Sequence, residues 1–202
     1  MIAIIDCGMG NLRSVQKALE KVGAEAMITS NAGDIQEVEK VLLPGVGAMR
    51  PAMERLGELG LVDAIKKVTK TKKPFLGICL GLQLLFSAGK EGGHVEGLGI
   101  FPGVVTRFME KDVKVPHMGW NQLRLIKRNC PLWKGIPDNA RVYFCHSYYV
   151  HPAQSGIAAS LTEYGTNFVS AISKDNIFGV QFHPEKSQAV GLKILENFVR
   201  LK

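Results

Sequence analysis

The sequence predicts an α/β protein: a three-layer sandwich whose central, mostly parallel sheet carries helices on both faces and continues into an antiparallel extension. Two observations predict this fold class. In the first half of the chain, short apolar runs alternate with segments of helical period, as in successive βαβ units. From about Gly103 onward, short strand-like runs follow one another with turn residues between them, which favours antiparallel pairing.

Four apolar runs are predicted to form the parallel strands, with helices between them whose apolar residues recur every three or four positions. The third run should end at Pro44 and Gly45, because proline has no N–H to donate to a strand ladder. The runs are IAIID at 2–6, AMIT at 26–29, VLL at 41–43 and PFLGI at 74–78, and the helical faces are Leu12/Val15/Leu19/Val22 and Leu61/Ala64/Ile65/Val68.

The second half contributes six short strands and a closing helix. We expect these strands to extend the same sheet, since no linker rich in Pro, Gly or Ser separates the halves. A single domain over residues 1–202 is therefore predicted. The strands are VVTRF, NQLRLI, RVYFC, GIAASL, FVSAI and IFGVQF, and Val190, Ile194, Phe198 and Leu201 mark the helix.

The composition excludes several classes of protein. The N-terminus has neither a basic start nor a long apolar run, so we expect a cytoplasmic protein that does not bind membranes. The net charge is +7, but the one dense basic run, KKVTKTKK at 66–73, falls at a predicted helix end, where lysines complement the helix dipole. We therefore expect no nucleic-acid partner, while a phosphorylated substrate or an acidic partner surface remains compatible with the charge.

The four cysteines form no CxxC pair and no Cys/His ladder of zinc spacing. Neither a disulfide framework nor a metal site is predicted, and no cofactor motif is present. Gly8-Met9-Gly10 resembles the start of a dinucleotide fingerprint, but Arg13 occupies the third glycine position and no acidic ribose partner follows. The loop from Asp6 is better interpreted as a helix entry, with Asn11 as its cap.

The sharpest local feature is PFLGICLGLQLLF, in which an apolar strand runs into Gly77-Ile78-Cys79-Leu80-Gly81 and then into a helix. This G-x-C-x-G pattern is a nucleophile elbow, because its glycines permit a tight strand-to-helix turn that exposes one side chain. The helix N-terminus beside it favours a thiolate. The alternative, a small buried hydrophobic cysteine, is the interpretation we keep for the other three cysteines.

A cysteine nucleophile needs a base, and the best candidate lies in GVQFHPEKS. His183 follows an apolar strand, at the edge where α/β sheets bind ligands. Glu185 can accept a hydrogen bond from its imidazole and hold its tautomer. Among the competing histidines, His146 ranks second because it also ends an apolar strand, and a structural role for His183 itself is the competing interpretation.

Acyl transfer also requires an oxyanion hole. The elbow supplies one donor, the N–H of Leu80. The turn LLPGVGA at 42–48 follows a neighbouring predicted strand, and its amides are candidates for a second donor. On its own PGVG is equally compatible with a plain β-turn.

Together, PGVG, GICLG with Gln83 after it, and FHPE resemble the class I, triad-type glutamine amidotransferases in order and spacing over nearly the whole chain. Within that family, PHMGWN at 116–121 and HSYY at 146–149 resemble the glutaminase subunits that serve histidine biosynthesis. The resemblance implies that Cys79 attacks the side-chain amide of glutamine, that His183 moves the protons and that Glu185 orients His183.

Further roles follow from the resemblance. Gly45, Gln83, Ser147 and Tyr148 would hold the amino-acid end of glutamine, and Val46, Gly47 and Leu80 would frame the oxyanion. The partner would be a cyclase subunit with a (β/α)8 barrel, forming a heterodimer in which ammonia is channelled to make imidazole glycerol phosphate and aminoimidazole carboxamide ribotide. The positions implied at or near that junction are Met9, Asn11, Trp120, Tyr143 and Lys186.

A glutaminase that ran freely would waste glutamine, so we expect one peptide unit of PGVG to rest misoriented until the partner binds its ligand. Gly45 and Gly47 would lower the free energy required for such a peptide flip, because glycine accepts backbone angles that other residues resist. Alternatives remain open at this point. They are a glutaminase for a different synthase, a cysteine peptidase with the same elbow, and a non-catalytic redox sensor in which Cys79 is oxidised.

Overall fold

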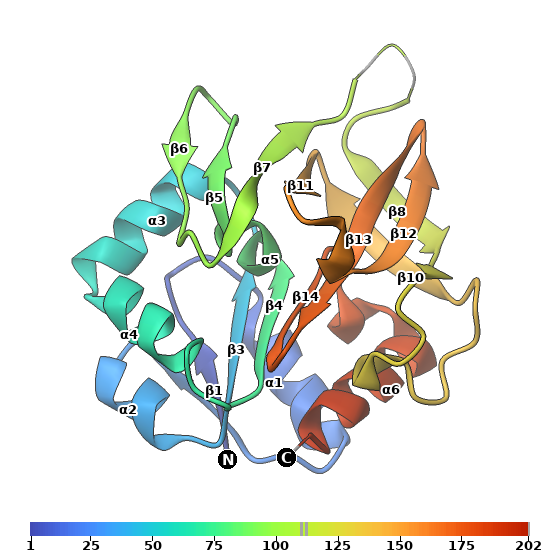
Figure 1. Cartoon of the computed structure of the whole chain (residues 1–202). Coiled ribbons are helices and arrows are strands. Elements are labelled where there is room, and N and C mark those ends of the chain that lie inside the picture. Colours follow the sequence, from blue (N-terminus) through green and yellow to red (C-terminus); the bar gives the residue numbers. More distant parts are fainter. Residues whose placement is uncertain (110, 112, 202) are drawn as a thin grey trace.

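The computed structural model describes residues 1–109, 111 and 113–201, and these residues form one twelve-stranded mixed sheet and a separate two-stranded sheet. The centre of the large sheet is parallel and lies in the middle of the molecule (Figure 1). Its strands are, in spatial order, β2 (Ala26–Thr29), β1 (Ile2–Ile5), β3 (Lys40–Gly45), β4 (Phe75–Cys79) and β14 (Ile177–Val180).

Beyond β14 the large sheet becomes mostly antiparallel, and the predicted mixed α/β architecture is confirmed. The strands of this part are β13 (Thr166–Lys174), β11 (Tyr148–Pro152), β7 (Phe101–Arg107), β5 (Phe86–Gly89) and β6 (Val95–Glu96), with β12 (Ala158–Tyr164) and β9 (Arg124–Leu125) branching from β13. The two-stranded sheet consists of β8 (His117–Gln122) and β10 (Arg141–His146).

Two predictions about the second half were correct only in part. The run IFGVQF forms β14, which pairs antiparallel with β13 as expected but also pairs in parallel with β4, so this strand joins the two parts of the sheet. All four residues of β14 are buried, as expected for a strand covered on both faces. The run RVYFC lies in β10, which pairs only with β8 and so stands outside the large sheet. The run NQLRLI is divided, because its first two residues end β8 whereas Arg124 and Leu125 form β9, which joins the large sheet through β12. Exposed residues alternate along β8 with the buried His117 and the half-buried Gly119 and Asn121, which leaves one of its faces uncovered.

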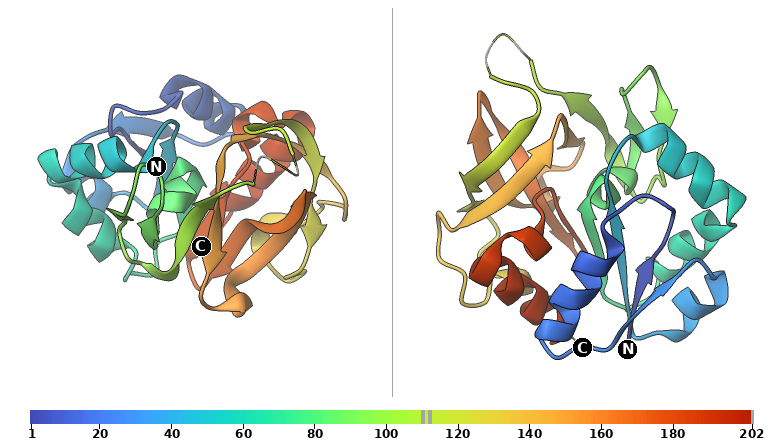
Figure 2. Two further views of the ribbon diagram at one scale, coloured as in Figure 1. Left: turned by 90° about the horizontal axis from the view of Figure 1, so that it is seen from above. Right: turned by 180° about the vertical axis from the view of Figure 1, so that it is seen from behind.

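Helices cover both faces of the parallel strands (Figures 1 and 2). One face carries α1 (Leu12–Lys21) and α6 (Gln188–Val199), and the other carries α2 (Ala32–Glu37), α3 (Met49–Glu58) and α4 (Leu61–Val68). The short elements are α5 (Leu80–Leu84) and the 3-10 turns η1 (Pro131–Trp133), η2 (Ser155–Ile157) and η3 (Pro184–Lys186). The basic run at 66–73 lies at the end of α4, as predicted.

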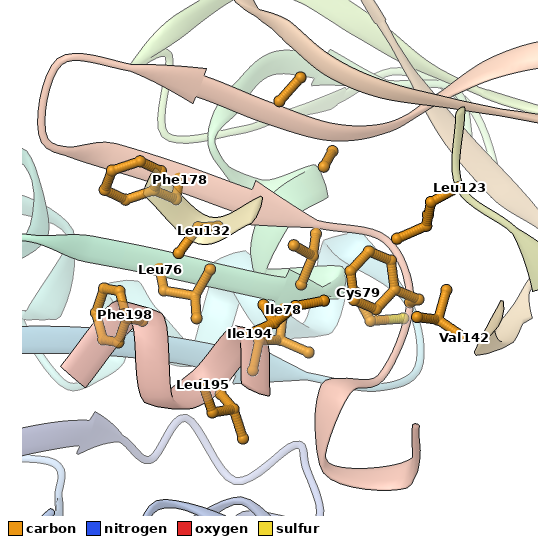
Figure 3. Packing of buried hydrophobic residues seen from close by; sticks show 14 of the residues in the cluster. Leu76, Ile78, Cys79, Leu123, Leu132, Val142, Phe178, Ile194, Leu195 and Phe198 are labelled. Atoms are coloured by element: carbon orange, nitrogen blue, oxygen red, sulfur yellow. The ribbon is translucent and has the colours of Figure 1, made fainter. Parts of the chain in front are cut away.

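Two apolar clusters, one on each face of the sheet, form the core. Residues of β1 alternate between them, so that Ile2 and Ile4 face the α1/α6 side while Ala3 and Ile5 face the other. Figure 3 shows how Ile194 and Phe198 of α6 pack toward the parallel strands. Each such fully buried side chain stabilises the fold by roughly 1.5–3 kcal/mol.

The strand after α2 corrects one predicted boundary. β3 continues through Pro44 to Gly45, where the sequence predicts its end before Pro44. The pairing of β3 with β1 reaches only Leu42, and from there β4 is its one neighbour, so a residue without an N–H is tolerated. This extension brings the backbone of Gly45 opposite Cys79.

The sequence reasoning missed α2, α3 and the strands β5, β6 and β11. α2 has six residues and one fully buried apolar side chain, Ile35, which is too little for a periodic signal. The segment of α3 contains Pro51 and Gly57, the two residue types least favourable in a helix interior. The helix forms nevertheless, because Pro51 lies in the first turn, where its missing N–H has no intrahelical partner.

Among the described residues, no helix has the length and apolarity needed to cross a membrane.

Candidate active site

Three segments that are far apart in the sequence end at the same edge of the sheet. β3, β4 and β14 are parallel neighbours, with Gly45 opposite Cys79 and Val180 opposite Ile78. PGVG, the cysteine elbow and the segment leading to His183 therefore leave the sheet side by side. The carboxyl edge of parallel strands is where α/β proteins place ligands.

Cys79 occupies a strained turn between β4 and α5. Its φ of 54° and ψ of −108° are rarely adopted by a residue with a side chain. The flanking glycines allow the turn to form. A Cβ on Gly77 would lie 2.7 Å from the carbonyl oxygen of Gly81, and a Cβ on Gly81 would lie 1.8 Å from that of Leu43. The sequence pattern of an elbow thus corresponds to a turn that only glycine permits at both positions.

His183 and Glu185 form a buried pair. Nδ1 of His183 lies 2.8 Å from Oε1 of Glu185, and the two side chains are 4% and 3% exposed. The backbone of His183 is held in place because its N–H donates to the carbonyl of Tyr143 in β10 at 2.9 Å. With Nδ1 turned to Glu185, Nε2 is the ring atom available to Cys79.

The surroundings of His183 favour its protonated form. Burial by itself lowers the pKa, but hydrogen bonds and electrostatic interactions with Cys79 and Glu185 outweigh burial and raise the pKa of His183 to about 10. At neutral pH the imidazole therefore carries a proton that it can transfer to a group bound above Cys79.

A pocket of about 260 Å³ opens above this group. Nine of the predicted site and junction residues line it, together with Glu91, Pro116, Cys145 and the second-ranked base His146. The nine are Val46, Gly47, Cys79, Leu80, Gln83, Ser147, Tyr148, His183 and Lys186. Larger hollows occur elsewhere on the surface, but this one holds the thiol and the imidazole, so we take it as the candidate active site.

The remaining predicted site residues lie around this pocket. Gly45 pairs with Cys79 in the ladder, and a Cβ there would lie 3.1 Å from Cβ of Leu80. Glu185 stands behind His183. A Cβ on Gly47, whose φ is +93°, would lie 2.8 Å from Cε of Met9, so Met9 borders the oxyanion turn.

The predicted junction residues fall into two groups. Trp120 and Tyr143 face each other across β8 and β10 with ring centroids 6.2 Å apart, and Nζ of Lys186 lies 5.9 Å from the Tyr143 ring. We call Trp120, Tyr143 and Lys186 the rim: Lys186 lines the pocket, and Trp120 is 43% exposed. Asn11 acts as the predicted cap of α1, where its side chain accepts a hydrogen bond from the N–H of Ser14.

Gln83 and Gln181 form a buried amide pair next to the nucleophile. Nε2 of Gln83 donates to the carbonyl of Tyr148 at 2.9 Å and to Oε1 of Gln181 at 3.1 Å, and Nε2 of Gln181 lies 3.6 Å from Sγ of Cys79. The sequence reasoning missed Gln181. Its signal was a single amide inside the apolar run IFGVQF, where a buried polar group must have a partner.

Glu91 was also missed. It lies in the turn between β5 and β6, lines the pocket, and accepts a hydrogen bond from the N–H of Met49 at 3.0 Å. Together with Lys186, it places opposite charges on the pocket wall. A turn glutamate has no distinguishing sequence context, so only the fold reveals this arrangement.

His146, the second-ranked base, has a different role. Its Nδ1 donates to the carbonyl of Tyr148 at 2.8 Å, and its Nε2 lies 3.0 Å from Nδ1 of His117. Burial lowers the pKa of His146 to about 3, with a further contribution from the charge of His183. Both ring nitrogens are engaged, so His146 is not available as a proton acceptor. Among the described residues, no group of three or more His, Cys, Asp or Glu side chains is arranged to hold a metal ion.

Comparison with known proteins places these features in a family. The family model described as glutamine amidotransferase class-I matches residues 3–201. The chain is 53% identical to the imidazole glycerol phosphate synthase subunit HisH of Geobacter metallireducens, over 100% of this chain and 98% of that protein. It is 51% identical to subunit HisH 1 of Campylobacter jejuni, over 100% of both chains.

Solved structures support the fold assignment. The structure of PurLQS from Thermotoga maritima matches with a TM-score of 0.77 at 18% identity, covering 98% of this chain and 96% of that chain. The glutaminase domain of Trypanosoma brucei CTPS with bound acivicin matches with a TM-score of 0.70 at 15% identity, covering 100% and 94%. At these identities the likeness concerns the fold alone.

Proposed function

Because the chain belongs to the glutamine amidotransferase class-I family, and shares about half of its residues with HisH subunits over its full length, we propose that it is the glutaminase subunit of an imidazole glycerol phosphate synthase. The observation that carries the proposal is the meeting of Cys79, His183 and Glu185 at one pocket on the carboxyl edge of the sheet. The subunit is an enzyme that hydrolyses glutamine to glutamate and ammonia.

The reaction uses Cys79 as nucleophile. Its sulfur attacks the side-chain carbonyl carbon of glutamine, the C–N bond breaks, and the leaving nitrogen takes the proton of His183 and departs as ammonia. His183 then removes a proton from water, which attacks the thioester and releases glutamate with the thiol restored. Glu185 acts throughout by orienting the imidazole and stabilising its positive charge.

The negative charge that develops on the carbonyl oxygen needs donors. The N–H of Leu80 at the start of α5 is one, because the first N–H groups of a helix have no intrahelical partner. The turn at Val46 and Gly47 also lines the pocket, and we assign the second donor to its backbone amides. Removing one oxyanion donor reduces the rate by about 10²–10³.

The wall of the pocket suits a zwitterionic amino acid. Glu91 can pair with an α-ammonium group and Lys186 with an α-carboxylate. Gln83, Ser147, Tyr148 and the backbone of Gly45 supply neutral hydrogen-bonding groups beside them. The pocket has a volume of about 260 Å³ and carries one acidic and one basic side chain, Glu91 and Lys186. These properties favour a small amino acid as substrate over a peptide chain.

The ammonia is used by a second subunit. We assign this partner as a cyclase with a (β/α)8 barrel, which converts the ammonia and a phosphorylated ribotide into imidazole glycerol phosphate and aminoimidazole carboxamide ribotide. Met9, Asn11, Trp120, Tyr143 and Lys186 are the proposed junction residues. Support comes from the exposed Trp120 and its contact with the half-buried Tyr143, since tryptophan and tyrosine are enriched in binding hot spots.

The decisive experiment measures glutamate release and imidazole glycerol phosphate formation by the purified chain with a histidine-pathway cyclase. Glutamine should support synthesis in the complex, and Cys79→Ala should abolish this while synthesis from added ammonium salt is retained. Cys130→Ala, a change at a buried thiol outside the pocket, is the matched control and should keep both activities. Glutamine-dependent synthesis by the Cys79→Ala complex would rule the proposal out.

A further inference from the structure

A continuous series of hydrogen bonds links strand β8 to the candidate active site. Nδ2 of Asn121 lies 3.3 Å from Nε2 of His117, and Nδ1 of His117 lies 3.0 Å from Nε2 of His146. Nδ1 of His146 then lies 2.8 Å from the carbonyl oxygen of Tyr148. His117 and Asn121 are four residues apart on β8, so both face the interior while Met118 and Trp120 between them face outward.

The direction of every hydrogen bond in this series is determined. The carbonyl of Tyr148 can only accept, so His146 carries its proton on Nδ1 and accepts at Nε2. His117 must then donate from Nδ1 and accept at Nε2. Asn121 provides that donor: its Oδ1 accepts from the N–H of Gln122 at 2.7 Å, and its Nδ2 also donates to the carbonyl of Glu163 at 2.9 Å.

Both imidazoles are neutral. The side chains are buried, and burial lowers the pKa of His117 to about 4 and that of His146 to about 3. The ring of His117 stacks on Tyr164 with centroids 3.9 Å apart and on Phe144 at 4.7 Å. These histidines are therefore rigid and uncharged, and neither is suited to move a proton.

The series ends at the substrate-binding amide. The carbonyl of Tyr148 also accepts from Nε2 of Gln83, whose second N–H donates to Gln181. Both N–H groups of Gln83 donate to groups of the protein, so its Oε1 is the atom that can accept a hydrogen bond from a ligand in the pocket. The orientation of this amide depends on where the carbonyl of Tyr148 is held.

We infer that His117 and His146 are positioning residues for substrate binding: through the carbonyl of Tyr148 they fix the Gln83 amide so that its oxygen faces the α-ammonium group of glutamine. This inference rests on the proposed function, since glutamine is the ligand. It also gives His117 and Asn121 of the PHMGWN segment a role distinct from that of the outward-facing Met118 and Trp120.

The test measures glutamine affinity by titration calorimetry on full-length chains carrying Cys79→Ala, which prevents turnover. His117→Phe keeps an aromatic ring for the stacking on Tyr164 but removes the donor to His146. It should weaken glutamine binding about tenfold, as expected when one partner of a buried hydrogen bond is lost. His117→Asn can place an amide N–H where Nδ1 was and should bind within about threefold of the parent.

Ser160→Ala is the matched control. It removes a buried hydrogen bond to Ser170 that lies outside the pocket, and glutamine affinity should not change. Unchanged affinity in His117→Phe, or equal weakening in the Phe and Asn variants, would overturn the inference and leave the proposed function intact. If the Cys79→Ala parent does not bind glutamine at all, the proposed function fails together with the inference.

Two further readouts separate positioning from general stability. In the complex with the cyclase, His117→Phe should raise the KM for glutamine about tenfold with kcat little changed, since Cys79, His183 and Glu185 are untouched. A fall in kcat at unchanged KM would contradict the inference. Nitrogen-15 NMR of the unsubstituted chain should find both imidazoles as Nδ1–H tautomers, and an Nε2–H tautomer at His146 would overturn it even if the variants fail to fold.

Discussion

Glu185 directs one carboxylate oxygen at Nδ1 of His183, 2.8 Å away, and among the described residues its other oxygen has no hydrogen-bond partner. Among the described residues, the imidazole of His183 is therefore the hydrogen-bond partner of this buried carboxylate. Its negative charge is balanced by the proton that it helps His183 to retain.

Glu185→Gln should lower glutaminase activity by about 10²–10⁴, because the amide preserves the shape but removes the charge that stabilises the imidazolium. The measurement is kcat for glutamate release in the complex. Glu196→Gln, which neutralises a carboxylate in surface ion pairs of α6, is the matched control and should retain full activity. Retention of activity in Glu185→Gln would show that orientation alone suffices.

The elbow can be tested through its second glycine. Gly81→Ala would place a Cβ 1.8 Å from the carbonyl oxygen of Leu43, so α5 and β3 must separate at the position of the site. We expect the free energy of unfolding to fall by about 3 kcal/mol or more and glutaminase activity to be lost. Urea unfolding and activity assays measure both effects.

Gly57→Ala is the corresponding control. Gly57 lies in α3, and a Cβ there would meet no atom within 4 Å. Alanine should stabilise the chain by about 0.5–1 kcal/mol, since it favours the helix more than glycine does. If Gly81→Ala behaved like Gly57→Ala, the elbow would be less constrained than its geometry indicates.

If the turn after β3 stabilises the oxyanion, a change in this turn should impair glutamine-dependent synthesis but not ammonia-dependent synthesis. Gly47 has a φ of +93°, so Gly47→Ala forces the turn to move. Glutamine-dependent synthesis should fall by about 10²–10³ while ammonia-dependent synthesis in the complex is unchanged. Gly92→Ala, at another glycine with positive φ but with open space around it, should leave both activities intact.

The neutral histidine pair predicts a loss of stability in acid. In the unfolded chain His117 and His146 titrate near their ordinary pKa of 6.5, whereas in the folded chain the values are about 4 and about 3. Between the folded and the unfolded pKa values, the unfolded chain binds more protons than the folded chain does. The free energy of unfolding therefore falls as the pH drops below 6.5. The nearby charge of His183 adds to the cost of protonating His146.

Each of these histidines should remove on the order of 2 kcal/mol of folding free energy between pH 8 and pH 5. Urea unfolding at the two pH values measures the loss. In His117→Phe the loss should be smaller by about 2 kcal/mol, since one of the two groups is gone. An identical loss in both proteins would show that other groups control acid stability.

The proposed junction predicts a hot spot at the rim. Trp120→Ala should weaken binding of the cyclase by about tenfold or more without unfolding the chain, because the ring is half-exposed and central to the aromatic rim. Sedimentation or calorimetric titration of the two subunits measures the affinity. Ile126→Ala, at another exposed apolar side chain outside this rim, should bind the cyclase normally.

The family could be inferred from the chain without coordinates because its chemistry lies in short segments. Gly77, Cys79 and Gly81 are close in sequence, and so are His183 and Glu185. A tight turn or a pair two residues apart is governed by local backbone geometry. Local geometry is what residue types and their spacing report.

The long-range partners could not be inferred in this way. Gln181 lies 102 positions from Cys79, and His117 lies 29 positions from His146, so only the packing of β8, β10 and β14 brings each pair together. The same limitation explains why the parallel pairing of β14 with β4 was not predicted. A fully apolar strand does not report which neighbour it pairs with.

A thiol elbow, a histidine with its carboxylate and a glycine-rich turn could be recognised from residue types and spacing, because each depends on residues within a few positions of one another. The packing of distant segments made β3, β4 and β14 parallel neighbours. It also decided that His146 supports the site as a neutral group instead of acting as its base. Burial and hydrogen-bond direction set the protonation of a histidine, and both arise only when distant strands pack together.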